Sequence, residues 1–196
     1  YDDTLMTAGE PSYHCQLVQT ISADMALTTA YILEDWQSDY ATKLLEPSPT
    51  GVYRSAEEVL QEMFKSLSTG LQFTSDTRLG RPLGTFDRPR PTRAEVRRSG
   101  RSSQHVMLSL DTLKDLAARL AGDDTNMAAT LDASFIQAMS QLAALDDPTF
   151  AGVSEPQTRL KIEVLQQSVD KIRAVVREEL GPTLGVAAGF NALDGD

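Results

Sequence analysis

Two histidines and one cysteine, His14, Cys15 and His105, are the side chains of this sequence best suited to nucleophilic or metal chemistry. A catalytic triad needs a base within hydrogen-bond reach of a serine or cysteine. His14 and Cys15 are adjacent, and adjacent side chains on a helix point about 100° apart, so they do not face each other. We therefore expect Cys15 to be a small buried residue rather than a nucleophile. We expect His105 to be exposed or to cap the start of a helix.

The common metal and nucleotide motifs are missing from the sequence. It contains no His-Glu-x-x-His zinc motif, no phosphate-binding Gly-x-x-x-x-Gly-Lys-Ser/Thr loop and no Gly-x-Gly-x-x-Gly fingerprint. A single cysteine excludes an internal disulfide and an all-cysteine metal site. A mixed site from the two histidines and distant carboxylates is possible in a helical protein, but no spacing selects one. On these residues alone we assign no catalytic residue and no metal ligand.

The most unusual segment is rich in arginine. Eight arginines and no lysine lie between residues 78 and 101, at positions Arg78, Arg81, Arg88, Arg90, Arg93, Arg97, Arg98 and Arg101. Only Asp87 and Glu95 oppose them, which leaves this segment at +6 and the rest of the 196-residue chain at −16. Arginine is well suited to planar, bidentate pairing with carboxylate or phosphate groups.

Three interpretations of this segment stay open. It can form surface ion pairs with acidic helix ends, line a cleft for an anionic ligand or metal chelate, or contact nucleic acid. The net charge of −10 and the single aromatic residue of the segment, Phe86, disfavour nucleic acid. We therefore expect no nucleic-acid partner.

The end of the chain, residues 185–196, is rich in glycine but also carries apolar side chains, which indicates packing rather than fraying. Asn191, Asp194 and Asp196 offer oxygen atoms to a hard cation, although three oxygens are few for such a site.

Apolar residues recur at steps of three and four through most of the sequence, which is the period of a helix packed on one side. The spacing predicts five helices, over about 11–40, from 55 to near 78–82, from 102 or 103 to 121, over about 127–142 and from about 155 to 180, the last stopped by Gly181-Pro182. The first has the apolar residues Val18, Ile21, Met25, Ile32 and Trp36, and we expect these stripes to form the core. The sequence predicts an all-α fold, an antiparallel helical bundle of about five helices with one long Arg-rich connection. No apolar run reaches the roughly 18 residues of a membrane-spanning helix.

Several segments resemble the imelysin family of bacterial envelope proteins, which includes insulin-cleaving membrane proteases and iron-regulated proteins. The ending Leu184–Asp196 is similar to the family's closing pattern, a run of small residues followed by Gly-Phe-Asn and Asp-Gly-Asp. Tyr13-His-Cys15, followed by a long helix reaching Trp36, resembles the helix that opens the family's second half. The sequence Leu-Gly-Arg-Pro-Leu-Gly at 79–84 and the stretch 99–113 follow in the expected order.

The resemblance implies a fold of two bundle-like halves, located in the periplasm or anchored to an envelope membrane as a lipoprotein. It also implies a role in iron or haem acquisition, with peptidase activity claimed for some members. The family motif Gly-x-His-x-x-Glu belongs to the first half, and neither His14 nor His105 has a glutamate three positions later. We therefore expect residues 1–196 to be the C-terminal half, with iron or zinc bound mainly by an N-terminal half that is absent here.

This resemblance leads to a functional hypothesis: a periplasmic, non-enzymatic imelysin-like protein that serves iron, metal or haem uptake by binding a metal, a chelate or a partner. Its expected partners are the N-terminal half and an envelope iron-uptake protein. One alternative is a metallopeptidase whose metal lies in the absent half; another is a structural bundle that binds a partner through the arginines. If the ligand cleft lies between the halves, this chain supplies one wall, for which the candidate residues are Arg98, Ser99, Ser102, Asn191 and Asp194.

Overall fold

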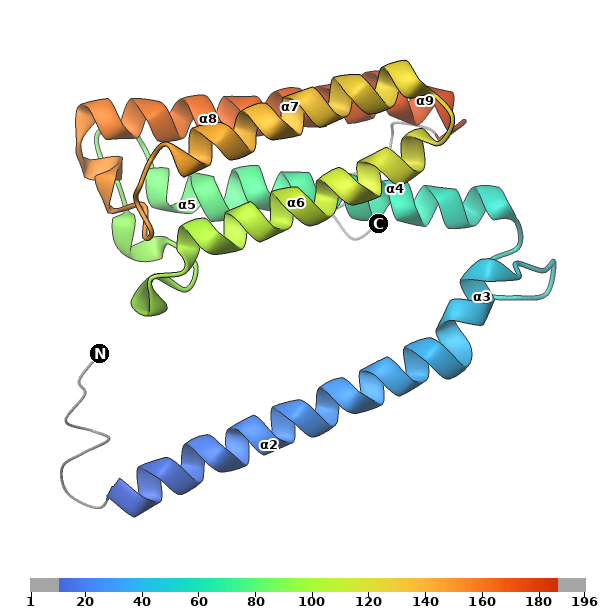
Figure 1. Ribbon diagram of the computed structural model, residues 1–196, viewed down its shortest axis with the longest axis horizontal. Helices are drawn as coiled ribbons and strands as arrows, with labels where there is room; N and C mark the ends of the chain where they lie inside the picture. Colours follow the sequence, from blue (N-terminus) through green and yellow to red (C-terminus); the bar gives the residue numbers. More distant parts are fainter. Residues whose placement is uncertain (1–10, 187–196) are drawn as a thin grey trace. The chain divides into compact units, whose positions relative to one another are not determined.

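The computed structural model describes residues 11–186, which divide into two compact units, Tyr1–Val59 and Leu60–Asp196. Within the described residues every regular element is helical, and β structure is limited to a single bridge between Thr85 and Arg88. The predicted all-α fold is confirmed (Figure 1).

The described part of the first unit begins with one continuous run of helix. The helix α2 (Pro11–Asp35) passes through the π turn η1 (Trp36–Tyr40) into the short helix α3 (Ala41–Leu45). It ends at Glu46, whose backbone leaves the helical region at φ −126° and ψ 62°. The sequence predicted a helix over about 11–40, and the helical run continues to Leu45, directly before residues 46–51 with their two prolines and a glycine.

The apolar residues of α2 do not behave as the sequence predicted. Ile21 is 50% exposed, Met25 and Ile32 are each 62% exposed, and Trp36 is 49% exposed, so the prediction of a core stripe here is wrong. Leu27 and Leu33, on other sides of the same helix, are exposed as well. Helical spacing shows that a helix has an apolar side, but it does not identify the surface that packs against this side. Within the described part of the first unit, residues 11–59, these side chains remain exposed.

Three joined segments lead into the second unit, α4 (Ala56–Gln72), the π turn η2 (Phe73–Leu79) and α5 (Gly80–Leu83), with the boundary between the units at Leu60. The Glu58 N–H donates to the Ser55 hydroxyl at 3.4 Å, and the Glu58 carboxylate accepts from the Arg54 N–H at 2.7 Å, so Ser55 caps α4. The sequence predicted an end near residues 78–82, and the helix runs to Leu83. Leu79 and Leu83 are both buried in the core.

Four more helical segments complete the second unit: α6 (Ser102–Ala121), α7 (Thr125–Ala143), α8 (Pro156–Val175) with its π turn η6 (Val176–Leu180), and α9 (Gly181–Thr183). Gly122, at φ 56°, ends α6 as predicted. The Asp124 carboxylate caps α7 by accepting from the N–H groups of Asn126 and Met127. The predicted end at residue 180, before Gly181-Pro182, is three residues too early, since the helix runs to Thr183.

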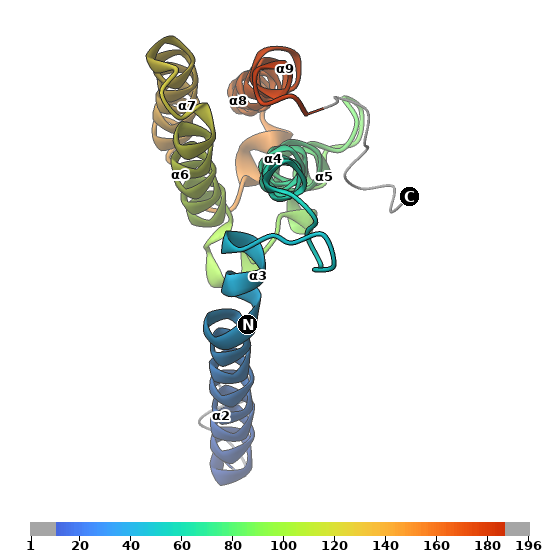
Figure 2. The same ribbon diagram turned by 90° about the vertical axis from the view of Figure 1, so that its right-hand side faces the viewer.

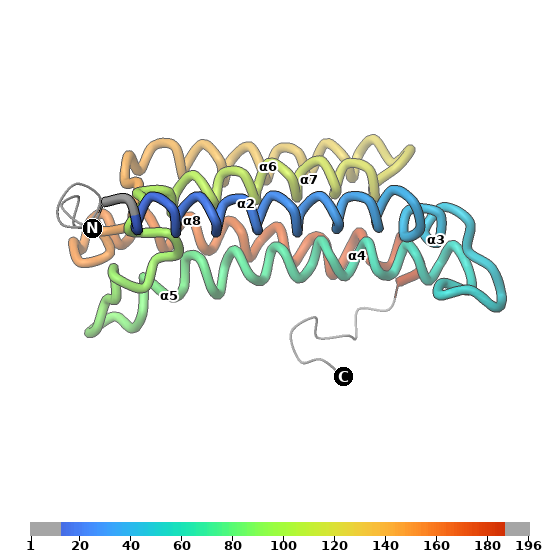
Figure 3. Tube along the Cα trace, turned by 90° about the horizontal axis from the view of Figure 1, so that it is seen from below, coloured from blue at the N-terminus to red at the C-terminus, as the bar shows by residue number. Residues whose placement is uncertain are grey.

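The helices α4, α6, α7 and α8 alternate in direction along the chain and form an antiparallel bundle (Figures 1 and 2). Contacts join α6 to α7, α7 to α8, and both α6 and α8 to η2, which closes the ring of helices. The tube view in Figure 3 follows these helices along their length. The predicted core stripes of the second unit are buried, including Val106, Leu110, Leu131, Phe135, Leu165, Val169, Ile172, Val176 and Leu180.

Candidate functional site

The arginine loop, residues 84–101, connects α5 to α6 and has a defined backbone. Gly84 has φ 59°, and a Cβ atom there would lie 2.4 Å from the Arg88 carbonyl oxygen, so only glycine fits this turn. The Arg90 N–H donates to the Pro82 carbonyl at 2.8 Å. Two 3₁₀ turns follow, η3 (Pro91–Arg93) and η4 (Arg97–Ser99). The loop therefore holds its arginines in fixed positions.

Arg78, at the base of this loop, has a structural role. Its Nε donates to the Glu95 carboxylate at 2.7 Å, and its guanidinium also contacts the Ser109 hydroxyl. The same guanidinium lies 5.0 Å from the centre of the Phe73 ring. Arg78 thus joins η2, the arginine loop and α6. Its carboxylate partner, Glu95, belongs to the same segment and not to an acidic helix end.

The other seven arginines are different: none of them forms an ion pair or side-chain hydrogen bond with a residue of the described range 11–186. Six are exposed and Arg90 is partly buried; they are Arg81, Arg88, Arg90, Arg93, Arg97, Arg98 and Arg101. Surface ion pairs therefore do not account for these seven positions. Their guanidinium groups remain available to an anion.

The candidate cleft residues on this loop have distinct surroundings. Arg98 is exposed on η4, and the Ser99 hydroxyl donates to the Val96 carbonyl at 2.9 Å. Ser102, the first residue of α6, is 2% exposed and donates to the Glu95 carbonyl at 2.6 Å. The Ser102 hydroxyl is thus occupied in holding the loop. Asn191 and Asp194 lie outside the described residues, so the cleft stays a prediction.

The histidines and the cysteine are not brought together. Cys15 is exposed, so the expectation of a buried cysteine is wrong, and the reason is the uncovered surface of α2 on which it lies. The rings of His14 and Tyr13 form an edge-to-face pair, with 5.6 Å between ring centres. His105 is partly buried in the first turn of α6. Among residues 11–186 no three histidine, cysteine, aspartate or glutamate side chains are grouped so that they could hold a metal ion.

A polar cluster between η2 and α8 was not found from the sequence. The fully buried Ser75 donates from its hydroxyl to Asp170 Oδ1 at 2.7 Å. Gln166 Nε2 donates to the Ser75 carbonyl at 3.0 Å. The Arg173 guanidinium donates to Asp170 at 3.0 Å and to Asp76 at 3.2 Å.

The local cause of this cluster is the π turn. In this turn the Ser75 carbonyl accepts the N–H of Gly80, five residues later, and it also accepts the Gln166 side chain from α8. A usable signal was present in the sequence, since Thr74-Ser75-Asp76 places polar residues where the apolar stripe of α4 should continue. The Ser75 hydroxyl has a carboxylate as its partner and is shielded from solvent. This arrangement fastens two helices and does not make Ser75 a nucleophile.

Arg159 makes a second buried polar contact, near the base of the arginine loop. It is 9% exposed, and it donates from Nε to the Glu163 carboxylate and from an Nη atom to the Leu83 carbonyl, each at 2.7 Å. Its guanidinium also lies 5.9 Å from the centre of the Phe86 ring. Arg159 therefore ties the start of α8 to the end of α5, from which the loop departs.

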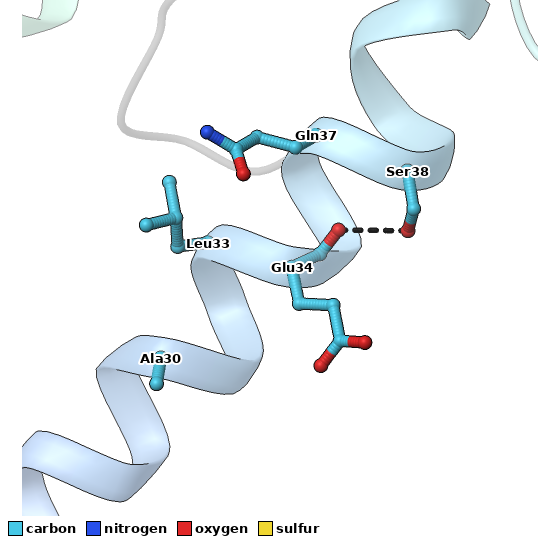
Figure 4. Close-up of a pocket in the computed structure, with 5 residues that line it drawn as sticks. All are labelled: Ala30, Leu33, Glu34, Gln37 and Ser38. Carbon is cyan, nitrogen blue, oxygen red and sulfur yellow. Dashed lines mark hydrogen bonds between the residues drawn. The ribbon is translucent and has the colours of Figure 1, made fainter.

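Surface hollows lined by described residues lie elsewhere on the chain. One, of about 340 Å³, lies along α2 and η1, where Leu33 and Gln37 extend to the same side of the helix and the Ser38 hydroxyl donates to the Glu34 carbonyl at 2.7 Å (Figure 4). A second, of about 600 Å³, lies between α6 and α7 and is lined by Asp111, Thr112, Lys114, Asp115, Ala118 and Asp132. A third, of about 290 Å³, lies between α7 and α8 and is lined by Gln141, Ala144, Leu160, Lys161 and Val164. None of the three adjoins the arginine loop.

Comparison with protein families gave one result. The family model described as imelysin matches residues 1–176. The matched range includes the Tyr13–Cys15 segment, the 79–84 sequence and the 99–113 stretch, and it ends before the closing sequence Leu184–Asp196. No curated protein and no solved structure matches the chain.

Proposed function

Because this chain belongs to the imelysin family, we propose that it is a non-enzymatic protein of the periplasm or envelope that serves iron, metal or haem uptake by binding a metal, a metal chelate or a partner protein. Family membership over residues 1–176 is the observation that carries this proposal. Among the described helices, none has the length and apolar character that crossing a bilayer requires.

The arginine loop supports the binding part of the proposal. Metal chelates that bear carboxylates are anionic, and guanidinium groups pair with carboxylates through two parallel hydrogen bonds. The loop offers Arg98 on an ordered 3₁₀ turn, without a described partner and next to Ser99. These two residues are the part of the proposed ligand-binding wall that lies within the described structure.

The metal itself is proposed to be bound elsewhere. The described residues do not group three suitable ligands, so the side chains present there do not fit a complete iron or zinc site. We assign the metal ligands to an N-terminal half that carries Gly-x-His-x-x-Glu, a motif that this sequence lacks. This chain then acts as the C-terminal half, and the N-terminal half is its first partner.

The test is a binding titration of the protein that contains both halves. Ferrous iron without oxygen, ferric citrate and zinc are titrated separately by calorimetry, and bound metal is counted by mass spectrometry. We expect saturable binding of at least one iron form, weakened by Arg98→Gln but not by Lys65→Gln, which removes an exposed charge on α4. The absence of iron and chelate binding would refute the proposal.

A metallopeptidase activity would contradict the non-enzymatic part of the proposal. The same preparation is incubated with an unfolded protein substrate, with and without a chelator. We expect the substrate to stay intact over a long incubation. Cleavage that a chelator abolishes and added zinc restores would identify the protein as a peptidase instead.

A further inference from the structure

The arginine loop makes one end of the second unit basic. In Figure 1 this loop lies at the end of the bundle where α6 and α8 begin. Its turn η3 packs against η5 (Ala151–Ser154), and the Ser103 N–H donates to the Pro148 carbonyl at 3.1 Å, so the connection from α7 to α8 lies at the same end. In addition to the ion pair of Arg78 and Glu95, this end carries seven arginines and four carboxylates, which are those of Asp87, Asp146, Asp147 and Glu155. This basic end has an excess of three positive charges on a chain of net charge −10.

An exposed aromatic residue lies among these arginines. Phe86 is 82% exposed and occupies the turn that the Thr85–Arg88 bridge closes. Gly84 sets the backbone of this turn, and the Arg159 guanidinium lies near one side of the ring. The turn therefore presents Phe86 outward on an ordered support. The apolar surface of this ring is in contact with water, and covering it by a partner or an interface would be favourable.

We propose that the basic end, defined by Phe86 and the seven arginines that have no partner among residues 11–186, docks on the surface of an anionic phospholipid bilayer. Clustered basic residues are attracted to anionic headgroups, and aromatic side chains settle at the boundary between headgroups and acyl chains. The two features occur together here, on one loop. The proposed contact is peripheral, and it goes beyond the binding of a metal or chelate.

The same features argue against other anionic partners. Single-stranded nucleic acid requires several aromatic residues for stacking, whereas this loop has one. An acidic protein would explain the arginines, but it would also need a pocket shaped for the Phe86 ring. A bilayer surface needs no such pocket, because lipids adapt to the side chain.

The orientation follows from the charge distribution. The rest of the chain is strongly acidic, so an anionic surface repels it while attracting the basic end. The protein is therefore expected to stand with the arginine loop toward the lipid. This arrangement places α6 and α8 with their first turns nearest to the membrane.

The first experiment is flotation of the purified chain with vesicles of phosphatidylcholine, alone or with about one third phosphatidylglycerol. We expect binding to the anionic vesicles at low salt and its loss at high salt. The variant Arg88→Gln/Arg93→Gln/Arg97→Gln should bind about 100-fold more weakly, from about five-fold for each basic residue near the surface. It leaves Arg98 and Ser99 of the proposed ligand wall unchanged.

The matched control removes the same charge from exposed helix positions: Lys65→Gln/Arg119→Gln/Lys171→Gln. It should bind anionic vesicles within about two-fold of the unchanged chain, since these three residues lie outside the basic end. The far-UV circular dichroism of both triple variants should equal that of the unchanged chain. Equal losses in the two variants would overturn the proposal, because net charge rather than the loop would then govern binding.

The second experiment asks whether residue 86 enters the interface. Trp36 is the only tryptophan, so Phe86→Trp combined with Trp36→Phe places a single fluorophore on the loop. We expect its emission to shift to shorter wavelength on anionic vesicles and to be quenched by brominated lipid. Three results would overturn the proposal: no binding to anionic vesicles at low salt, an unchanged emission spectrum in bound protein, or binding to polyglutamate or RNA but not to vesicles.

Discussion

Replacing Arg159 by methionine should destabilise the second unit, because the arginine connects two helices from a buried position. Methionine keeps most of the aliphatic stem, so packing changes little while the guanidinium contacts are lost. Two hydrogen bonds disappear, one to the Leu83 carbonyl and one to the Glu163 carboxylate, each 2.7 Å long. The change therefore isolates the polar contribution of this residue.

The expected effect can be estimated from these contacts. Leu83 is 3% exposed, so its carbonyl loses a charged donor with little access to water; such a loss is worth about 1.5–3 kcal/mol. The Glu163 side chain is 34% exposed and regains solvent, so the ion pair adds less than about 1 kcal/mol. We expect a loss of about 2–3 kcal/mol in the free energy of unfolding, which corresponds to about 1 M in the urea midpoint.

The assay is urea denaturation followed by circular dichroism at 222 nm, with Arg119→Met as the control. Arg119 also pairs with a carboxylate four positions away on its helix, but its side chain is 74% exposed. Its replacement should leave the midpoint unchanged within error. A midpoint for Arg159→Met equal to that of the control would refute the claim that the link between α8 and α5 stabilises the fold.

Three further predictions concern single positions: Ser75 and Gly84 in the second unit, and Ser55, which caps α4. Ser75→Ala removes the buried hydrogen bond to α8 and should lower the free energy of unfolding by about 1–2 kcal/mol in the same assay. Gly84→Ala should lower the free energy of unfolding by more than about 1 kcal/mol, since φ is positive and the new Cβ atom meets the loop backbone. Gly100→Ala, also at positive φ but in open space, should lower it less. Equal effects of the two substitutions would contradict this steric argument. Ser55→Ala removes the cap of α4 and should lower the free energy of unfolding by about 0.5–2 kcal/mol. The Ser55 hydroxyl also holds the pKa of Glu57 below its ordinary value, so the stabilisation linked to Glu57 is present above its unfolded pKa and is lost as the pH falls through the lower folded pKa. The same substitution should therefore raise that pKa in an NMR titration, and an unchanged value would contradict the assignment.

The core of the second unit was predictable because helix geometry fixes which residues share a side. Val106 and Leu110 on α6, and Leu131 on α7, follow that period and are buried. The same period in α2 led to a wrong prediction, since Ile21 and Met25 are exposed. Periodicity is a property of one helix, whereas burial depends on a second surface that the sequence pattern does not specify.

The candidate site shows the corresponding limit for polar residues. Arg78 and Arg98 are the same residue type in one basic segment, yet Arg78 is paired with Glu95 while Arg98 is free of described partners. The link between Ser75 and Asp170 spans 95 positions. Such contacts depend on how helices are placed side by side, which local sequence patterns do not determine.

Two helices continue past a proline, Pro82 in α5 and Pro182 in α9, and the second was predicted to stop its helix. A proline ring clashes with the carbonyl four residues earlier and lacks an N–H group, so it normally ends a helix. In each case that carbonyl, of Arg78 or of Glu178, lies in a π turn, η2 or η6, where the hydrogen bonds reach one residue further. The wider turn displaces this carbonyl from the proline ring, so the helix continues. The continuation of α5 also positions the arginine loop, because the Leu83 carbonyl at the end of α5 accepts a hydrogen bond from Arg159 and the loop begins at the next residue.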